Sequence, residues 1–281
     1  MASQACLPSG ACDCHMHIYD ARYPAAAGAS LTPPDALVPA YRTLQSELGL
    51  QRCVVVTPST YGLDNRCTVD AVRALNEAGT AARGIAVLRS DIDQATLEAL
   101  HASGVRGVRF NQTLGGTSLD DLEPLADRIA PLGWHVELLL RGDSWPGMVP
   151  RLRALPVPVV FDHFGRLPYP AMGHAGHRAV LELLETGRAW VKLSGAYLQG
   201  VESAAWIADA TAMTESFIRT APHRIVWGSN WPHPTVHAGL HDAPDDAELL
   251  ALLHRWIADE PTTWRVLVDN PSILYDFPTP P

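Results

Sequence analysis

The sequence lacks the features that mark several large classes of protein. It has no apolar run long enough to cross a membrane, and it does not begin with the basic start and apolar stretch of a signal peptide. It is also poor in basic residues: 21 lysines and arginines against 30 aspartates and glutamates give a net charge of -9. A nucleic-acid-binding protein would carry the opposite balance. We therefore expect a cytoplasmic protein that acts on neither membranes nor nucleic acids, and an oligomer is possible.

Cysteine is scarce as well, with five residues in 281. Cys53 falls inside an apolar run, and Cys12 and Cys14 lie just before His15 and His17. An odd number of cysteines in such places favours reduced thiols over a disulfide framework.

Eight short apolar runs alternate with helical patterns, and several of the runs are continuous in valine, isoleucine and leucine, as strands covered on both faces require. The runs span residues 11–17, 53–57, 84–88, 107–111, 135–140, 157–163, 190–194 and 225–229. Helical periodicity fills segments such as 119–129 and 179–184. The alternation predicts an α/β fold, a single (β/α)8 barrel domain over 1–281 with a proline-rich exposed tail at 277–281.

Local signals indicate where some helices begin and end. Ser118 and Asp121 resemble a capping box, and helix-ending glycines stand at positions 49, 104, 133 and 187. The longer segments 18–34 and 164–176 are candidate loops over the active end of the barrel.

His15 and His17 form an H-x-H pair at the end of the first strand. Alternate side chains of a strand share a face, so the two imidazoles point the same way. Such a pair can bind a metal or polarise an oxygen atom. Because the active site of a (β/α)8 barrel lies at the carboxyl ends of its strands, the pair marks the expected active end.

Polar side chains also follow most of the other strands. The candidates for catalysis are His15, His17, His163 and Asn230, and those for substrate binding are Ser59, Tyr61, Arg109, Asn111, Arg141, Arg166, Ser194, Tyr197 and His233. A guanidinium fork matches a carboxylate bidentately, so the arginines indicate an anion site, although surface ion pairs would explain Arg109 and Arg166 equally well. His174 and His177 either line the mouth or have structural roles.

The ordered set of His15 and His17, His163, and Trp227-Gly228-Ser229-Asn230-Trp231-Pro232-His233 resembles the amidohydrolase superfamily, and in particular its branch that acts on lactones. The resemblance extends from the first strand to residues 268–271. It implies a small sugar-acid or dicarboxylate lactone as the substrate, opened by hydrolysis or moved between ring sizes. It also implies that the three histidines surround the lactone carbonyl.

Two departures from the family pattern bear on the chemistry. The first is that no lysine or glutamate ends the fourth strand and no histidine ends the fifth, where metal-bearing members supply ligands. We therefore expect no cofactor and no metal. If one divalent ion such as zinc does bind, its ligands would be His15, His17 and His163.

The second departure is Asn230, where the family pattern has an aspartate that acts as general base. An amide cannot take that proton. Either an aspartate has been replaced in this chain, or the natural protein has lost or re-routed the proton transfer. Two other functions stay open: a metal-dependent amidohydrolase or decarboxylase, and an inactive barrel that binds a sugar acid.

Overall fold

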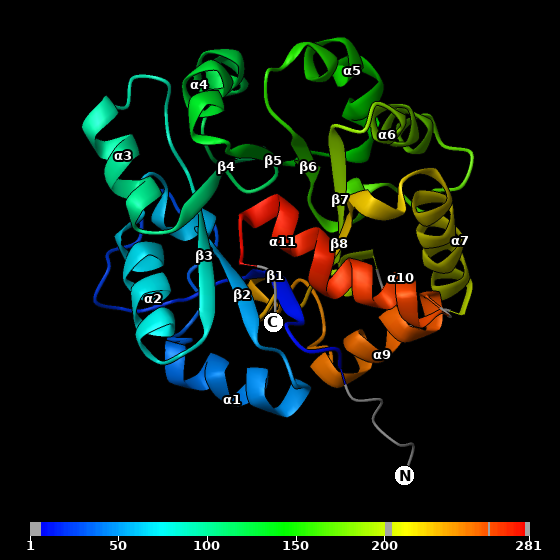
Figure 1. The fold of residues 1–281 in the computed structure, drawn as a ribbon, viewed down its shortest axis with the longest axis horizontal. Helices are drawn as coiled ribbons and strands as arrows, with labels where there is room; N and C mark the ends of the chain where they lie inside the picture. The colour runs from blue at the N-terminus through cyan, green and yellow to red at the C-terminus, as the bar shows by residue number, and fades with distance from the viewer. Residues whose placement is uncertain (1–6, 200–203, 258, 279–281) are drawn as a thin grey trace.

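The computed structural model describes residues 7–199, 204–257 and 259–278. Eight parallel strands form one sheet in chain order, wrapped by helices (Figure 1). The strands are β1 (Cys12–Met16), β2 (Arg52–Val56), β3 (Ala81–Ala86), β4 (Val105–Asn111), β5 (His135–Leu139), β6 (Val159–Phe161), β7 (Ala189–Ser194) and β8 (Ile225–Gly228). The predicted (β/α)8 barrel is confirmed, and every predicted apolar run overlaps one strand.

Helices follow the strands in the expected alternation. They are α1 (Val38–Leu48), α2 (Arg66–Glu77), α3 (Gln94–Ala102), α4 (Leu122–Ile129), α5 (Trp145–Ala154), α6 (Ala175–Glu185), α7 (Ala204–Thr220), α8 (Pro234–His237), α9 (Asp246–Trp256), α10 (Glu260–Trp264) and α11 (Asn270–Tyr275). None of the described helices is both long and apolar enough to cross a membrane.

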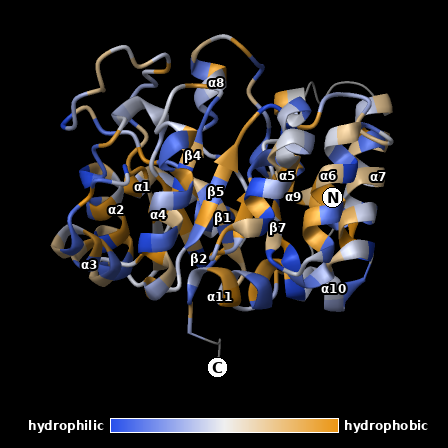
Figure 2. Ribbon diagram, turned by 90° about the horizontal axis from the view of Figure 1, so that it is seen from above, coloured by the Kyte–Doolittle hydropathy of each residue, from blue (hydrophilic) through white to orange (hydrophobic). Residues whose placement is uncertain are grey.

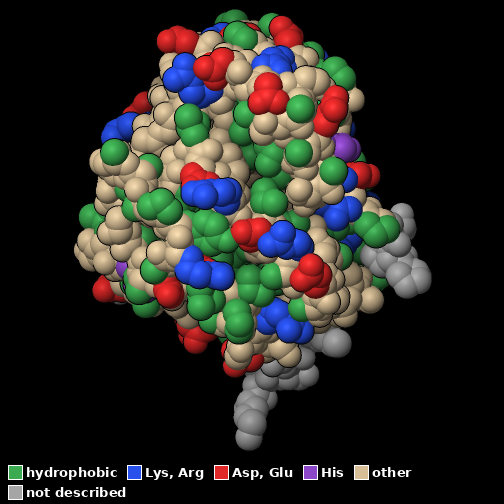
Figure 3. All heavy atoms as spheres, turned by 90° about the vertical axis from the view of Figure 1, so that its left-hand side faces the viewer, with side chains coloured by type: hydrophobic (Ala, Val, Ile, Leu, Met, Phe, Trp, Pro, Cys, Tyr) green, Lys and Arg blue, Asp and Glu red, His purple; other side chains and the backbone are tan. Residues whose placement is uncertain are grey.

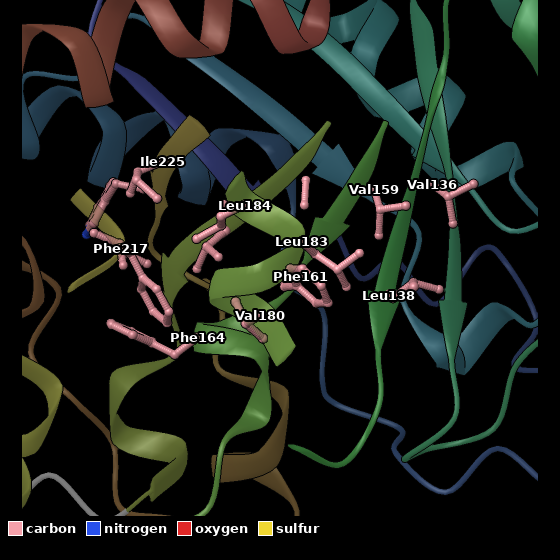
Figure 4. Packing of buried hydrophobic residues seen from close by; sticks show 14 of the residues in the cluster. Val136, Leu138, Val159, Phe161, Phe164, Val180, Leu183, Leu184, Phe217 and Ile225 are labelled. Atoms are coloured by element: carbon pink, nitrogen blue, oxygen red, sulfur yellow. The ribbon is translucent and has the colours of Figure 1, made fainter. Parts of the chain in front are cut away.

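Packing between the strands and the outer helices forms the largest apolar cluster. Figure 4 shows Val180, Leu183 and Leu184 of α6 lying beside Phe161 and Val159 of β6. The spacing of the three α6 residues places them on one face of the helix, as burial against a sheet requires. On the outer surface seen in Figure 3, acidic and basic side chains are interspersed, with no extended patch of one sign on that face.

The local signals were partly right. All four predicted helix-ending glycines adopt positive φ, as such a residue should. The capping box was wrong: the Ser118 hydroxyl accepts from the Asp120 N–H, while the Asp121 carboxylate accepts from the Ser90 N–H. Asp121 thus links its own loop to the neighbouring loop that carries Ser90, and it does not cap the start of its own helix.

The end of the barrel opposite the loops is closed by α11 (Figure 2). Tyr275 and Phe277 pack with Cys12, Cys14 and other inward residues of the strands. Phe277 is 5% exposed, with the guanidinium of Arg52 5.1 Å from the centre of its ring. The tail predicted to be exposed therefore begins too early, because Phe277 packs among the side chains that close this end of the barrel. Residues 279–281 lie outside the described residues.

The seam between β1 and β8 joins the two most informative segments of the sequence. The Asn230 N–H donates to the carbonyl of His15 at 2.8 Å, and the His17 N–H donates to the carbonyl of Trp231 at 2.8 Å. Buried Asp13 holds the same seam: its carboxylate accepts from Ser229 Oγ at 2.6 Å and from the Ser229 N–H at 2.9 Å. The backbone bonds thus fix the H-x-H segment against the loop that carries Asn230.

The role of Asp13 can be tested by its stability effect. Asp13 also accepts from the His15 N–H and the Tyr41 hydroxyl, so Asp13→Ala leaves several buried donors unpaired. We expect it to lower the free energy of unfolding by more than about 3 kcal/mol, since each orphaned group costs about 1–3 kcal/mol. Asp13→Asn retains an acceptor oxygen and should cost clearly less. Urea denaturation measures both, and equal losses for the two variants would contradict the account.

Candidate active site

A compact group of charged side chains lies inside the barrel, beneath its open end. The Arg109 Nε of β4 donates to Asp162 Oδ2 at 2.8 Å, and the Lys192 Nζ of β7 lies 2.6 Å from Glu137 Oε1 of β5 and 3.4 Å from Asp162 Oδ1. All four side chains are buried. Burial alone would raise the pKa of Asp162, but Lys192 and Arg109 outweigh it and hold that pKa well below its usual range. Two carboxylates and two cations therefore balance one another.

The three candidate histidines lie directly beside this group. The ring centre of His15 is 5.0 Å from that of His17 and 4.6 Å from that of His163. Burial lowers the pKa of each of the three, that of His17 to about 3 with a further contribution from Arg109. The three histidines are therefore neutral at physiological pH.

A hydrogen bond fixes which nitrogen of His17 carries the proton, and His163 has a partner that allows either tautomer. The Nδ1 of His17 lies 2.7 Å from the Val56 carbonyl, which can only accept, so Nδ1 carries the proton and Nε2 keeps its lone pair. The Nδ1 of His163 lies 2.8 Å from Ser194 Oγ, a hydroxyl that can donate or accept. The Nε2 of His15 is buried without a hydrogen-bond partner among the described residues.

A cavity of about 370 Å³ opens over the histidines. His17, His163 and Asn230 line it together with three arginines, Arg109, Arg141 and Arg166, and no described carboxylate does. The Nη1 of Arg166 is buried and has no partner among the described residues, whereas the Arg141 side chain is largely exposed and lies 3.7 Å from Asp143. His15 is not among the lining residues, but its ring lies next to those of His17 and His163, which are.

A second cavity of about 580 Å³ adjoins the first and shares Ser59, Arg109, Asn111 and Leu114 with it. Its outer wall includes Asp120 and Asp121, so its charge is mixed. The smaller cavity is the one that combines histidines with an excess of arginine, and we take it as the candidate active site.

The other sequence candidates lie near the cavity but do not line it. The Tyr61 hydroxyl accepts from the Asp20 N–H and donates to the Asp20 carbonyl, and His233 lies 3.2 Å from Asp246. Ser194 contacts His163, and the Tyr197 hydroxyl lies 2.7 Å from the amide nitrogen of Asn230. Ser194 and Tyr197 thus touch residues that line the cavity, while Tyr61 and His233 help to hold the surrounding loops.

His174, at the N-cap of α6, and His177, inside that helix, both make contacts that stabilise the fold. His174 caps the start of α6 by accepting from the Gly176 N–H, and buried His177 lies 2.8 Å from the Ser216 hydroxyl. Of the two alternatives for these histidines, the contacts favour the structural one.

The backbone after β6 is strained. His163, Phe164, Gly165 and Arg166 all have positive φ, between 48° and 67°. Non-glycine residues seldom adopt this region, and such residues concentrate at functional sites. Here the turn brings both His163 and Arg166 to the same cavity.

Sequence reasoning missed the buried charges beneath the histidines. Lys192 is the only lysine of the chain, and it stands in the otherwise apolar run of β7. Asp162 directly precedes His163, and Glu137 interrupts the apolar run of β5. A charged residue inside a strand covered on both faces was the available signal, because such a charge needs a partner.

Among the described residues, His15, Asp162 and His163 form a group that could hold a metal, since their potential ligand atoms all lie within 4.8 Å of one another. The fit is poor. Lys192 Nζ already lies 3.1 Å from His15 Nδ1, and Arg109 engages Asp162. A divalent ion would add two positive charges beside Lys192 and Arg109, whose charges Glu137 and Asp162 already neutralise.

The fold and the cavity together define a (β/α)8 barrel with a candidate ligand site, lined by histidines and arginines, at the carboxyl ends of its strands. The chain belongs to the amidohydrolase family, whose model matches residues 12–277.

Relatives with assigned names cover nearly the whole chain. It is 34% identical to a 2-pyrone-4,6-dicarboxylate hydrolase of Comamonas testosteroni, covering 96% of this chain and 91% of that protein. It is also 34% identical to a D-galactarolactone isomerase of Agrobacterium fabrum, covering 98% and 94%. Among solved structures, it is similar to a probable 2-pyrone-4,6-dicarboxylic acid hydrolase from Acinetobacter baumannii with citric acid bound: TM-score 0.84, 27% identity, covering 95% of this chain and 100% of that one.

The neutral state of His17 has a measurable consequence for stability. In the unfolded chain His17 takes up a proton below its usual pKa of 6.5, whereas in the folded protein it does so only near 3. Stability must therefore fall as the pH drops from 6.5 towards 3, by about 2 kcal/mol at pH 5 from this residue.

His17→Gln should remove that part of the acid sensitivity, as measured by urea denaturation between pH 7 and pH 5. His237→Gln, at an exposed position of α8, serves as the control and should leave the acid sensitivity unchanged. An identical pH dependence in the His17 variant and the parent would show that His17 is not held neutral.

Proposed function

We propose that this protein is a metal-independent enzyme that acts on a small sugar-acid or dicarboxylate lactone, opening its ring or moving it between ring sizes. The observation that carries the proposal is the 370 Å³ cavity, which combines neutral histidines with three arginines and lacks a described carboxylate. The net charge of the chain is -9, so its overall electrostatic field repels anions, whereas the arginines of this cavity attract an anion locally.

The relatives support both parts of the substrate description. A pyrone dicarboxylate and a galactarolactone are ring lactones that also carry a carboxylate, and they appear in the names of relatives that cover nearly all of this chain. The relative from Acinetobacter baumannii holds citric acid, a small polycarboxylate with a hydroxyl group.

In the proposed arrangement, Arg166 holds the carboxylate of the substrate, with Arg109 and Arg141 nearby. The buried Nη1 of Arg166 has no hydrogen-bond partner among the described residues, and a substrate carboxylate would supply one. Ser59 and Asn111, which line the cavity, would contact hydroxyl groups of the ring. Such fixed contacts orient the lactone before it reacts.

The reaction needs one proton to leave and one to arrive. A hydroxyl oxygen attacks the lactone carbonyl carbon and loses its proton, the negative charge collects on the carbonyl oxygen, and the ring C–O bond then breaks as the ring oxygen gains a proton. His15, His17 and His163 would surround that carbonyl, with an N–H of the group stabilising the negative oxygen. Attack by water gives hydrolysis; attack by a substrate hydroxyl gives ring migration.

In the proposed mechanism the general base would act from the position of Asn230. Asn230 lines the cavity, and its backbone N–H is fixed to His15. An amide has no useful basicity, so in this chain the proton must leave slowly or by another group. The same feature supports the second candidate function, an inactive barrel that binds a sugar acid. Binding without turnover, even after a carboxylate is introduced, would favour it.

A metal-dependent amidohydrolase or decarboxylase is the third candidate, since His15, Asp162 and His163 are close enough to share an ion. Their existing contacts with Lys192 and Arg109 argue against it. Elemental analysis of protein purified without chelator distinguishes this candidate from the metal-independent enzyme, because the metal-independent enzyme must contain no stoichiometric metal.

We expect Asn230→Asp to create or restore turnover, by about a hundred- to ten-thousand-fold. Aspartate has nearly the same shape, tolerates the positive φ of this position, and can accept from the Tyr197 hydroxyl that now contacts the amide. Ring opening and ring migration should be followed separately on a panel of aldarolactones. The kcat/KM of the variant should rise through an acidic pKa, because the base must be ionised.

Asn111→Asp is the matched control for this variant. It adds the same charge to the same cavity, and its Oδ1 can keep the bonds that Asn111 accepts from Thr113 and Leu114. It should give no such gain. If Asn230→Asp is no faster than the parent on any lactone that it binds, position 230 does not supply the base.

Arg166→Gln should weaken binding of a carboxylate-bearing lactone by about 1.5–3 kcal/mol, the typical worth of a hydrogen bond to a charged group. Binding of the matching methyl ester should change much less, and titration calorimetry can compare the two ligands. Arg141→Gln is the control, because that side chain is largely exposed and lies near Asp143, so its loss should be smaller. Equal losses of acid and ester binding in Arg166→Gln would rule out Arg166 as the carboxylate partner.

A further inference from the structure

Lys192 makes an unusual set of contacts for a lysine. Its side chain is fully buried, and its Nζ lies 2.6 Å from Glu137 Oε1, 3.4 Å from Asp162 Oδ1 and 3.1 Å from His15 Nδ1. Two of these three partners, His15 and Asp162, also belong to the group that could hold a metal ion. The ammonium therefore stands beside the same atoms that an ion would need.

We propose that Lys192 is a built-in cation that takes the place of a metal ion in this cluster and fixes His15 as the tautomer with its proton on Nε2. The catalytic role of this tautomer rests on the proposed function, because only that function identifies the substrate as a lactone. The tautomer and the exclusion of metal do not depend on it.

The tautomer follows from the chemistry of the contact. An ammonium group has only donors, so at the 3.1 Å contact with Lys192 the Nδ1 of His15 must accept. Asp162 Oδ1 competes for this nitrogen as an acceptor but lies farther away, at 3.4 Å, and the shorter contact favours Nδ1 without a proton. The proton of the neutral ring is then on Nε2, which is the atom without a partner among the described residues. An N–H nitrogen has no lone pair for a metal, so neither nitrogen of His15 is available as a ligand.

The charge of the cluster leads to the same conclusion. Asp162 is shared by Lys192 and Arg109, and Glu137 is paired with Lys192, so two buried carboxylates face two buried cations. A divalent ion at this place would add two positive charges where the local dielectric is low. Lys192 would have to lose its proton or move before the ion could bind.

The two histidines of the H-x-H pair thus receive opposite tautomers. The Val56 carbonyl makes His17 a ring with a free lone pair on Nε2, and Lys192 makes His15 a ring with a proton there. For the proposed reaction this gives one donor suited to a developing negative oxygen and one acceptor. Lys192 acts through His15 and is a positioning residue.

The test compares the parent, Glu137→Gln, and the double variant Lys192→Met/Glu137→Gln. The double substitution removes one buried cation and one buried anion together, so Asp162 keeps Arg109 as its partner and the cluster remains neutral. Glu137→Gln alone retains Lys192 and is the matched control. Thermal unfolding establishes that each variant is folded.

The first readout is the 15N spectrum of the histidine rings, with His15 assigned by its loss in His15→Gln. We expect Nε2–H for His15 in the parent and in Glu137→Gln. In the double variant we expect Nδ1–H, because Asp162 Oδ1, 3.4 Å away, is then the acceptor that remains. A merely structural role for Lys192 would not invert the tautomer.

The second readout is zinc affinity, measured by competition with a chromophoric chelator. The double variant should bind zinc about 10- to 100-fold more tightly than the parent and the control, as expected when an outer contact of a ligand changes. His15 with Nδ1–H in the parent, or one tightly bound zinc per parent chain, would overturn the inference. So would a folded double variant with unchanged tautomer and zinc affinity.

The parent spectrum decides the tautomer even if the double variant does not fold. The lactone panel decides the proposed function separately. An Nε2–H tautomer without turnover of any lactone would leave this inference standing and count against the function.

Discussion

The pairing of Asp162 with two cations is the constraint on which the rest of the site depends. This carboxylate is fully buried, and it is stable there only because Arg109 reaches it from β4 and Lys192 from β7. Glu137 completes the balance from β5. Charged side chains from β4, β5 and β7 and from Asp162, directly after β6, thus contact one another, and the charges of these four side chains cancel beneath the cavity.

Because the charges cancel, the three histidines above them can remain neutral and close together. If His15 and His163 were both protonated at their separation of 4.6 Å, they would repel one another by roughly 4 kcal/mol at an effective dielectric constant of 20. Neutral rings instead offer a defined pattern of donors and acceptors. The excess positive charge of the site is carried by the arginines that line the cavity, where a ligand can meet it.

The fold was largely predictable because it depends on repeated local signals. Each strand is a short apolar run, and the repeated alternation with helices leaves few other architectures. The site was predictable as far as strand ends define it: His17, His163, Asn230 and the three arginines do line one cavity. The bounds that failed, such as the tail at Phe277, failed because a residue distant in sequence packs against the predicted end.

The network beneath the site could not be predicted in the same way. Nothing near Lys192 in the sequence says that its ammonium meets His15, 177 residues away, or Glu137. These contacts arise only when the barrel brings β1, β5 and β7 around one axis. For the same reason, strand parity placed the H-x-H pair at the mouth but could not show that Val56 and Lys192 give the two rings opposite tautomers.

The most direct test of the central claim is a crystal structure of protein purified without chelator, with a carboxylate-bearing lactone, or its open hydroxy acid, bound. The account predicts the ligand in the cavity lined by His17, His163 and Arg166, with its carboxylate on Arg166, its ring carbonyl within hydrogen-bond distance of a histidine, and no metal between them. A ligand coordinated to an ion at His15 and Asp162, or one seated in the neighbouring 580 Å³ cavity away from the histidines, would contradict it.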